Sequence, residues 1–329
     1  MNTHSFLRRL GAVLLGAVLL FGGLVKLMDP LGSQLVMEAY LRFMHLSFLG
    51  FAAGFLSLLF NLLECVLGAA LIAGLFPLVA GAASGVLMLF YTVLTLALLI
   101  ANPSMDCGCF GELVHLTHAQ SFIKNLVLMG LWALAFFPAK RQVPQRKHRY
   151  VAFGIVMLGC LWFMVHSLRS LPAIDLTDLR IGTELSDGQI PLLGDDGEYH
   201  DEVLMEGKVL LMTVYDPGEL SEKEMDRIYE ERSVARTSGI RPVVVYAGEG
   251  GIYSSDKKTL MSLNRSNGGA SLIVDGQVTR KWTNANLPDA EELAMLSAED
   301  PSQLVAESEI RGRTLLGALS VVGMVLLLI

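Results

Sequence analysis

Charged residues are scarce in this chain of 329 residues: only 17% are Asp, Glu, Lys or Arg, whereas 53% are apolar and the mean hydropathy is +0.51. Soluble globular proteins are roughly a quarter charged. This scarcity excludes an ordinary cytosolic enzyme, a disordered chain and a nucleic-acid-binding protein.

The charges are also unevenly divided. Residues 1–172 hold 11 Lys and Arg against 5 Asp and Glu, and residues 173–329 hold 14 against 27. The two halves are therefore different bodies, with net charges of +6 and -13.

Long apolar runs fill the first half of the chain. Residues 48–138 contain only four charged side chains, Glu64, Asp106, Glu112 and Lys124. A membrane-spanning helix needs about 20 consecutive apolar residues. The runs predict spans at 10–28, 54–75, 78–101, 120–138 and 151–168, and a last span at 313–329. Residues 31–50 are apolar but interrupted by Glu38 and Arg42, which predicts an interfacial or re-entrant helix.

The two terminal spans leave alternatives open. Arg8 and Arg9 before an apolar run are also typical of a cleavable signal peptide, but no small-x-small cleavage site follows, so we expect a retained helix. The last span is short, about 24 Å at the usual helical rise. Either the chain is cut off at its end or its terminal carboxylate reaches the cytoplasmic interface.

Basic residues predict the orientation. The loop 139–150 is rich in Lys and Arg and contains no acid, so the positive-inside rule places it in the cytoplasm together with Arg8 and Arg9. Counting spans then puts the loop after the third span and all of residues 173–312 outside. In a bacterium the chain is thus expected in the inner (cytoplasmic) membrane, with 173–312 periplasmic or extracellular.

Residues 173–312 have the pattern of a small α/β domain. Buried strands are predicted at 208–216 and 241–247, a hairpin with an Asp-Gly turn at 270–283, and helices at 219–237, 256–265 and 287–298. This order resembles the thioredoxin-like fold. Residues 216–221 contain no Cys-x-x-Cys, however, and Gly268-Gly269 replaces the proline that precedes the third strand in that family. We expect a redox-inactive domain that binds a client or partner protein; an unrelated α/β domain is the alternative.

Four cysteines occur, and two of them are one residue apart. Cys65 and Cys160 lie inside apolar spans, which is typical of buried structural cysteine. Cys107 and Cys109 flank Gly108 at the outer end of the third span, where disulfides are permitted. The pair can cycle between dithiol and disulfide, or form a static disulfide that pins a turn.

A metal site is the third interpretation of this pair. Cys107, Cys109, His115 and His118 form a four-donor set, but the Cys-x-Cys spacing fits zinc poorly, so no metal is favoured. A capping box at 117–120 predicts a helix N-terminus nearby, which would favour a thiolate. Asp106 beside the pair would oppose it.

With the cysteine motif among the matching stretches, the first 140 residues resemble the DoxX / methylamine-utilisation protein E (MauE) group of four-helix membrane proteins. The matching stretches are 21–30, Glu64 with Gly68, 106–111 (including Gly111), 116–117 and 122–125 (including Lys124 and Asn125). The whole chain, with a fifth helix and the outer domain, resembles a DoxX-type subgroup typical of Bacteroidetes. The resemblance implies a helical membrane bundle that carries an extracytoplasmic domain.

The resemblance also implies a role in maturing exported proteins. MauE proteins are needed for maturing methylamine dehydrogenase, a periplasmic enzyme rich in disulfides. The layout is similar to quinone-linked disulfide-forming membrane enzymes, which makes a quinone a candidate cofactor. This chain departs from them in having Cys-x-Cys and no second outer cysteine pair. No residue indicates methylamine itself.

Glu64 lies near the middle of the second span, where an unpaired carboxylate is costly. It is either functional, as a proton carrier, or a protonated group that holds the bundle together. Lys26 and Lys124 are candidate partners, although Lys26 and Asp29 are three residues apart and can pair with each other.

These observations lead to two hypotheses for the function of the protein. The first is a thiol-disulfide or maturation factor that uses Cys107 and Cys109, with Glu64 handling protons. The second is a non-enzymatic scaffold with a structural disulfide, whose domain 173–312 recruits envelope proteins. A small-solute carrier has little support, because no inverted repeat is visible.

Overall fold

The computed structural model describes residues 3–103, 105, 107–112, 116–137, 147–172, 175, 177–248, 250–298 and 305–306. Two compact units divide at Leu168/Arg169, and each is described by itself. The predicted last span 313–329, Asp106, His115 and most of the basic loop 139–150 lie outside the described residues.

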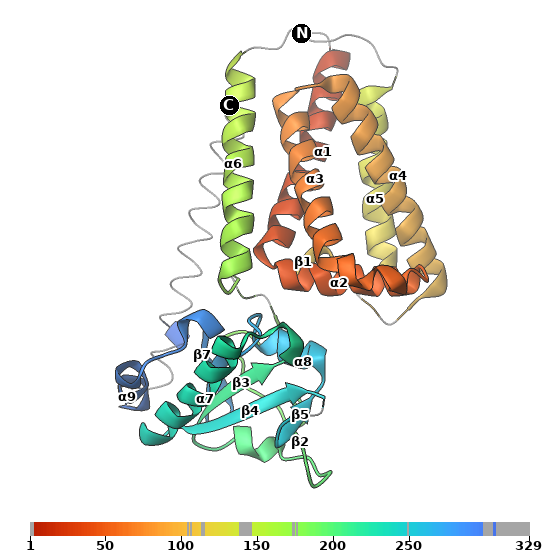
Figure 1. Cartoon of the computed structure of the whole chain (residues 1–329). Coiled ribbons are helices and arrows are strands. Elements are labelled where there is room, and N and C mark those ends of the chain that lie inside the picture. Colours follow the sequence, from red (N-terminus) through yellow and green to blue (C-terminus); the bar gives the residue numbers. More distant parts are fainter. Residues whose placement is uncertain are drawn as a thin grey trace. The chain divides into compact units, whose positions relative to one another are not determined.

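The first unit is a bundle of long helices (Figure 1). Its elements are α1 Thr3–Met28, α2 Pro30–Phe43, η1 Ser47–Ala52, α3 Ala53–Ala73, α4 Pro77–Ala101, β1 Cys109–Glu112, α5 His118–Phe136 and α6 Lys147–Arg169. Within the described residues, five helical segments are long and apolar enough to cross a membrane: 5–28, 47–73, 77–101, 118–136 and 147–169. The five described spans are thus confirmed. α2 is not among them and runs across the end of the bundle in Figure 1, as predicted for an interfacial helix.

Local sequence explains where these helices begin and end. Asp29 caps α2 by accepting the Gly32 N–H at 3.0 Å, and Pro30 occupies its first turn, where no N–H donor is needed. Gly74 ends α3 in the left-handed conformation, at φ 67°. The predicted capping box of α5 is confirmed: Thr117 accepts the Gln120 N–H, and the Gln120 side chain accepts the Thr117 N–H.

Glycines let α1 and α3 pack backbone against backbone. A Cβ on Gly68 would lie 2.5 Å from the Leu20 nitrogen, and one on Gly16 would lie 2.7 Å from the Gly68 carbonyl oxygen. A Cβ on Gly23 would lie 2.7 Å from Cys65 Sγ. Such contacts require small residues, as is usual where membrane helices cross closely. The crossing fixes the rotation of α3 against α1, and therefore which α3 side chains face the bundle interior.

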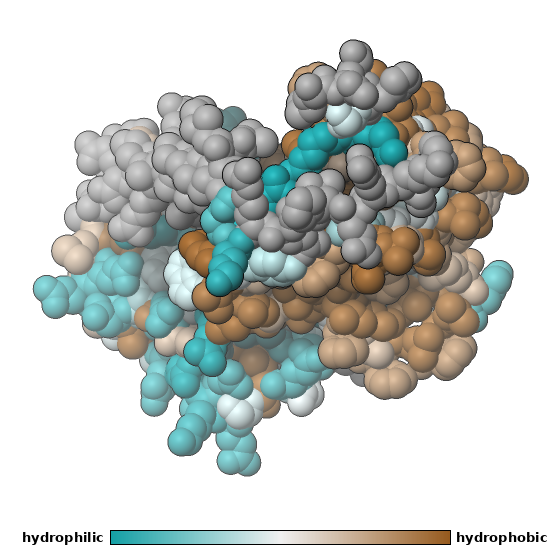
Figure 2. All heavy atoms as spheres, turned by 90° about the horizontal axis from the view of Figure 1, so that it is seen from above, coloured by the Kyte–Doolittle hydropathy of each residue, from teal (hydrophilic) through white to brown (hydrophobic). Residues whose placement is uncertain are grey.

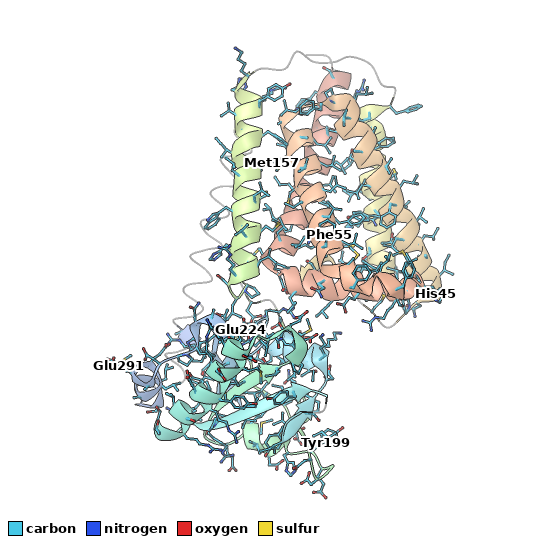
Figure 3. All side chains as sticks on the ribbon, viewed as in Figure 1. His45, Phe55, Met157, Tyr199, Glu224 and Glu291 are labelled. Carbon is cyan, nitrogen blue, oxygen red and sulfur yellow. The ribbon has the colours of Figure 1, made fainter. Side chains whose placement is uncertain are left out.

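Much of the outer surface of this unit is apolar. Phe55, Val86, Ile100 and Leu158 are each between 68% and 77% exposed. Hydrophobic residues dominate one side of the face shown in Figure 2, and side chains, with that of Phe55 among them, project from the helices in Figure 3. In water such a surface would be unfavourable, whereas in a bilayer it meets lipid.

Two basic segments meet at one end of the bundle. The Arg9 guanidinium donates to the carbonyl oxygens of Leu71 and Ile72 at the end of α3. A Cβ on Gly74 would lie within 3.4 Å of the guanidinium groups of both Arg9 and Arg149. The predicted orientation requires the N-terminus and the segment before α6 to share one side of the membrane, and this geometry agrees with that requirement.

The second unit is an α/β domain around a six-stranded mixed sheet. Its strands are β2 Leu193–Gly194, β3 Lys208–Val214, β4 Arg241–Ala247, β5 Tyr253–Ser255, β6 Gly269–Val274 and β7 Gln277–Trp282, in the order β2-β5-β4-β3-β6-β7. β3 pairs in parallel with β4 and antiparallel with β6, which pairs antiparallel with β7. The helices are α7 Glu222–Thr237, α8 Lys257–Leu263 and α9 Ala290–Ala298, and the 3-10 turns are η2 Asp201–Leu204, η3 Pro217–Glu219 and η4 Asn284–Asn286.

The predicted strands and helices are therefore present, with small shifts at their ends. Residues 217–219 form a 3-10 turn and α7 begins at Glu222, because Ser221 and Glu224 make a capping box there. The Asp-Gly turn is confirmed, with both Asp275 and Gly276 at positive φ. The short strands β2 and β5 were not predicted, because two or three residues carry no periodicity.

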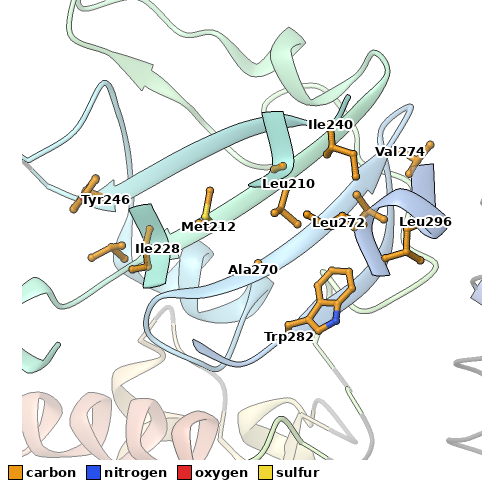
Figure 4. Close-up of a cluster of buried hydrophobic side chains, with 13 residues drawn as sticks. Leu210, Met212, Ile228, Ile240, Tyr246, Ala270, Leu272, Val274, Trp282 and Leu296 are labelled. Carbon is orange, nitrogen blue, oxygen red and sulfur yellow. The ribbon is translucent and has the colours of Figure 1, made fainter. Parts of the chain in front are cut away.

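The core of this unit lies between the sheet and the helices α7 and α9 (Figure 4). Leu210 and Met212 of β3 and Leu272 of β6 meet Ile228 of α7 and Leu296 of α9, all at most 1% exposed. Strands β3 and β6 are buried on both faces, so they appear in the sequence as largely apolar runs. Likeness to the thioredoxin-like fold stays a prediction.

Candidate functional site

A cavity of about 320 Å³ lies inside the helical unit. Its wall is formed by α1, α3, α4 and α5, by α2 across one end, and by the Cys107–Gly111 segment. Most of the lining is apolar, with aromatic rings from Phe60, Phe90 and Tyr91. Ligand pockets in proteins commonly have this size and this mixture of apolar walls with a few polar groups.

Glu64 is the central polar group of the cavity. It is 3% exposed, and its Oε1 accepts a hydrogen bond from Lys26 Nζ at 2.5 Å and another from the Tyr91 hydroxyl. The Lys26 ammonium also lies 5.9 Å from the centre of the Tyr91 ring. The structure thus pairs Glu64 with the first of its two predicted partners. Lys124, the second, lines the same cavity.

Two buried asparagines also line the cavity and leave amide atoms without partners. Asn125 donates through Nδ2 to the Tyr91 carbonyl and to Thr95 Oγ1, both at 3.1 Å. A carbonyl can only accept, so Nδ2 must face it and Oδ1 must point the other way. Among the described residues, Asn125 Oδ1 and Asn61 Nδ2 are buried with no hydrogen-bond partner. Buried polar atoms without partners are rare, so each needs an explanation.

The cysteine pair forms one end of the cavity wall. Cys107 is 2% exposed, Cys109 is half-buried, and neither is in a disulfide. The Cys107 carbonyl accepts a hydrogen bond from the Tyr40 hydroxyl of α2. Burial, together with the nearby Cys109, Cys107 and Glu64, raises the pKa of Tyr40 well above its usual range, so this hydroxyl remains a donor.

Gly108 allows the segment to pass close to α2. It has φ 53°, and a Cβ there would lie 2.5 Å from Val36 Cγ1. Glycine has no such atom and adopts positive φ without strain. Gly111, at φ 56°, donates its N–H to the Gly108 carbonyl at 3.2 Å and completes the turn. The Cys-Gly-Cys sequence therefore follows from backbone geometry as well as from chemistry.

His118 touches Cys107. Its Nδ1 lies 3.2 Å from Cys107 Sγ, and its Nε2 lies 3.0 Å from the Pro103 carbonyl oxygen. Because that oxygen can only accept, Nε2 carries the hydrogen, and Nδ1 of the neutral ring is the acceptor that faces the thiol. His118 is also the first residue of α5, so Cys107 lies at a helix N-terminus, as predicted. Both features favour a thiolate at Cys107.

Of the predicted metal donors, the structure brings Cys107 and His118 into contact, and His115 lies outside the described residues. Within the described ranges, no three His, Cys, Asp or Glu side chains are arranged to hold a metal ion. Asp29 caps α2, as described above. Cys65 is buried in α3, where its side chain interacts with that of Cys160 from α6.

Several cavity residues were missed by sequence reasoning. Ser57 and Asn61 lie on the same face of α3 as the predicted Glu64, and the spacing of four and three residues in an apolar helix was a usable signal. Tyr40 and Tyr91 gave no signal, because aromatic residues are common in membrane helices. His118 was considered only as a metal donor, although its place in a capping box beside the cysteines was visible.

Apolar spanning helices around a partly polar cavity define the class: this is a multi-pass helical membrane protein. Residues 5–138 match the family model described as methylamine utilisation protein MauE, so this part of the chain is similar to that family. This match confirms the resemblance seen in the first 140 residues. Searches of curated proteins and of solved structures found no match.

Proposed function

We propose that this protein exchanges thiols and disulfides with exported proteins at the outer face of the inner membrane, through Cys107 and Cys109. The observation that carries the proposal is the contact between Cys107 Sγ and His118 Nδ1 at 3.2 Å. A thiol beside a ring nitrogen that accepts its proton is a nucleophile or a good leaving group, whereas an inert structural cysteine needs no such neighbour.

Burial suggests different roles for the two sulfurs. Cys109 is half-buried and meets the client, whereas Cys107 is buried beside His118. In the oxidised protein a client thiol gives its proton to His118 Nδ1 and attacks Cys109 Sγ, the Cys107–Cys109 bond breaks, and Cys107 leaves as a thiolate that takes up that proton. A second client thiolate then attacks the mixed disulfide and releases Cys109. The client gains one disulfide, and this protein gains two thiols.

Thiol trapping in membranes tests this proposal. In a Cys65→Ala/Cys160→Ala background only Cys107 and Cys109 can react with an alkylating reagent. We expect the pair to be protected until mild reduction and then to take up two labels per chain. A mixed disulfide should accumulate when Cys107 is replaced by Ala and the client is already oxidised, because Cys109 attacks the client disulfide and no neighbouring thiol resolves the product. If Cys107→Ala and Cys109→Ala leave the disulfides of exported proteins unchanged, the proposal is wrong.

The histidine has its own test. His118→Ala removes the proton acceptor, so alkylation of Cys107 at neutral pH should slow by about tenfold or more. His166→Ala is the matched control, because His166 stacks on Trp162 in α6, with ring centroids 5.4 Å apart. Equal rates in the two variants would mean that the His118 contact has no chemical role.

A scaffold is the second candidate. It is supported by the second unit, which contains no cysteine and so brings no thiol chemistry of its own. In that case Cys107 and Cys109 would be dispensable for exported disulfides, while crosslinking through surface positions of 177–298 would capture a stable envelope partner. Under the thiol-exchange proposal the same domain holds the client, and capture should depend on Cys109.

A further inference from the structure

The proposed exchange leaves two electrons on Cys107 and Cys109 in each cycle, and the structure indicates where they go. We propose that the cavity of the helical unit binds a lipid-soluble quinone, which reoxidises the cysteine pair. This inference rests on the proposed function and goes beyond it by naming the electron acceptor and its site.

The position of the cavity selects a ligand that dissolves in lipid. Its lining comes mainly from membrane-spanning helices, and it reaches the outer surface of the bundle at Phe90, which lines the cavity and is 41% exposed. Phe90 of α4 stacks on Phe60 of α3, with ring centroids 6.1 Å apart. A ligand with an apolar tail can therefore enter between α3 and α4 and leave its tail in the bilayer.

The central ion pair of the cavity favours a neutral ligand over an ion. Lys26 and Glu64 compensate each other at 2.5 Å, so the pair carries no net charge to bind an ion. The side chain of Lys26 is 14% exposed and lines the cavity, and in the described part of the chain its ammonium donates one hydrogen bond, to Glu64. An ammonium has three N–H groups. It can therefore also donate to a carbonyl oxygen placed beside it.

The unpartnered amides fit a ligand that presents an acceptor in one redox state and a donor in the other. Asn61 Nδ2 is a donor without an acceptor, and Asn125 Oδ1 is an acceptor without a donor. Small rotations of these side chains would bring both atoms to a ligand in the cavity that they line. A quinone carbonyl accepts hydrogen bonds, and a hydroquinone hydroxyl also donates them. Flat aromatic side chains, Tyr40 and Tyr91 among them, provide faces on which such a ring can stack.

The chemistry balances within this one cavity. When Cys107 and Cys109 join, their sulfurs release two electrons and two protons. The quinone takes both electrons and receives a proton on each ring oxygen, which yields the hydroquinone. His118 accepts the proton of Cys107, and the cluster of Lys26, Glu64 and Tyr91 exchanges protons with the ring oxygens. A ligand that takes two electrons and two protons and partitions into lipid belongs to the quinone class.

The test uses the full chain in lipid nanodiscs, in the Cys65→Ala/Cys160→Ala background and without oxygen. The reduced protein is mixed with decylubiquinone, and hydroquinone formation is followed by absorbance while free thiols are counted. We expect one quinone reduced and two thiols lost per chain. Leu94→Trp fills the cavity and should raise the KM for quinone by at least about tenfold. Leu96→Trp, on the 40% exposed face of the same helix, should change it little.

Binding and exchange are measured separately. Asn61→Leu removes the amide without adding bulk and should also raise the KM for quinone. It takes the place of Leu94→Trp if that variant does not fold. A Cys107→Ala/Cys109→Ala chain should still bind an azidoquinone, and the photolabel should fall on α2–α5. Exchange of the oxidised pair with dithiothreitol tests the proposed function alone. Exchange without quinone reduction, or equal effects of Leu94→Trp and Leu96→Trp, overturns the quinone inference, whereas loss of exchange overturns the proposed function.

Discussion

Replacing Lys26 by Met tests the ion pair at the centre of the bundle. Lys26 Nζ and Glu64 Oε1 are 2.5 Å apart, and their side chains are only 14% and 4% exposed. Deleting one partner of a buried ion pair costs roughly 3–5 kcal/mol, because the remaining charge is left without compensation. The Tyr91 hydroxyl still donates to the same oxygen and offsets part of that cost. We therefore expect Lys26→Met to lower the free energy of unfolding by about 3 kcal/mol.

A double-mutant cycle isolates the interaction. Glu64→Gln removes the charge but keeps an oxygen for Tyr91, so Lys26→Met in that background should cost about 1 kcal/mol, and the coupling should be about 2 kcal/mol. The four variants are unfolded reversibly by titrating SDS into mixed micelles. Lys147→Met, at the exposed start of α6, should change stability by less than about 0.5 kcal/mol. A coupling below about 0.5 kcal/mol would refute the pairing.

Three further predictions concern packing and titration. Burial, with smaller contributions from Glu292 and Asp289, raises the pKa of Glu231 to about 7. Its ionisation therefore opposes folding: stability should fall as the pH rises from about 4.5 to 7, by roughly 3 kcal/mol at most. Glu231→Gln should flatten this pH dependence in proteolysis assays and stabilise the α/β unit at pH 8, whereas Glu230→Gln should not. Gly68→Val would drive a Cβ to 2.5 Å from backbone and should cost at least about 3 kcal/mol in SDS titration, whereas Gly130→Ala, with open space around it, should be neutral. Asn264→Ala should cost about 2–3 kcal/mol by pulse proteolysis, because its buried amide donates to the carbonyls of both β6 and β7.

The spans were predictable because bilayer crossing is a property of one segment at a time. A helix satisfies its own backbone hydrogen bonds, and about 20 apolar residues suffice to place it in lipid. The segment 31–50 shows the same logic, since two charges were enough to distinguish α2 from a span. Strands β3, β4 and β6 were predictable as buried apolar runs, whereas β2 and β5 are too short to leave a pattern.

The candidate site was only partly visible. Cys107, Cys109 and Glu64 could be named as chemically unusual residues for their positions. That they line one cavity could not be derived, because Cys107 and Glu64 are 43 residues apart in the chain, and their proximity depends on how four helices cross. His118 illustrates the same limit: the capping box predicted its helix, but only the fold brings its ring to Cys107.

The sequence by itself determined that this chain is a membrane protein of two parts and where its paired cysteines lie along the chain, and it predicted which face of the membrane its basic ends occupy. These properties follow from composition, hydropathy and capping, which act over neighbouring residues. Only the tertiary structure decided that Glu64 pairs with Lys26, that His118 contacts Cys107, and that both pairs border one cavity. Those contacts depend on the rotation and crossing of helices, which at the α1–α3 crossing is set by backbone contacts at Gly16, Gly23 and Gly68.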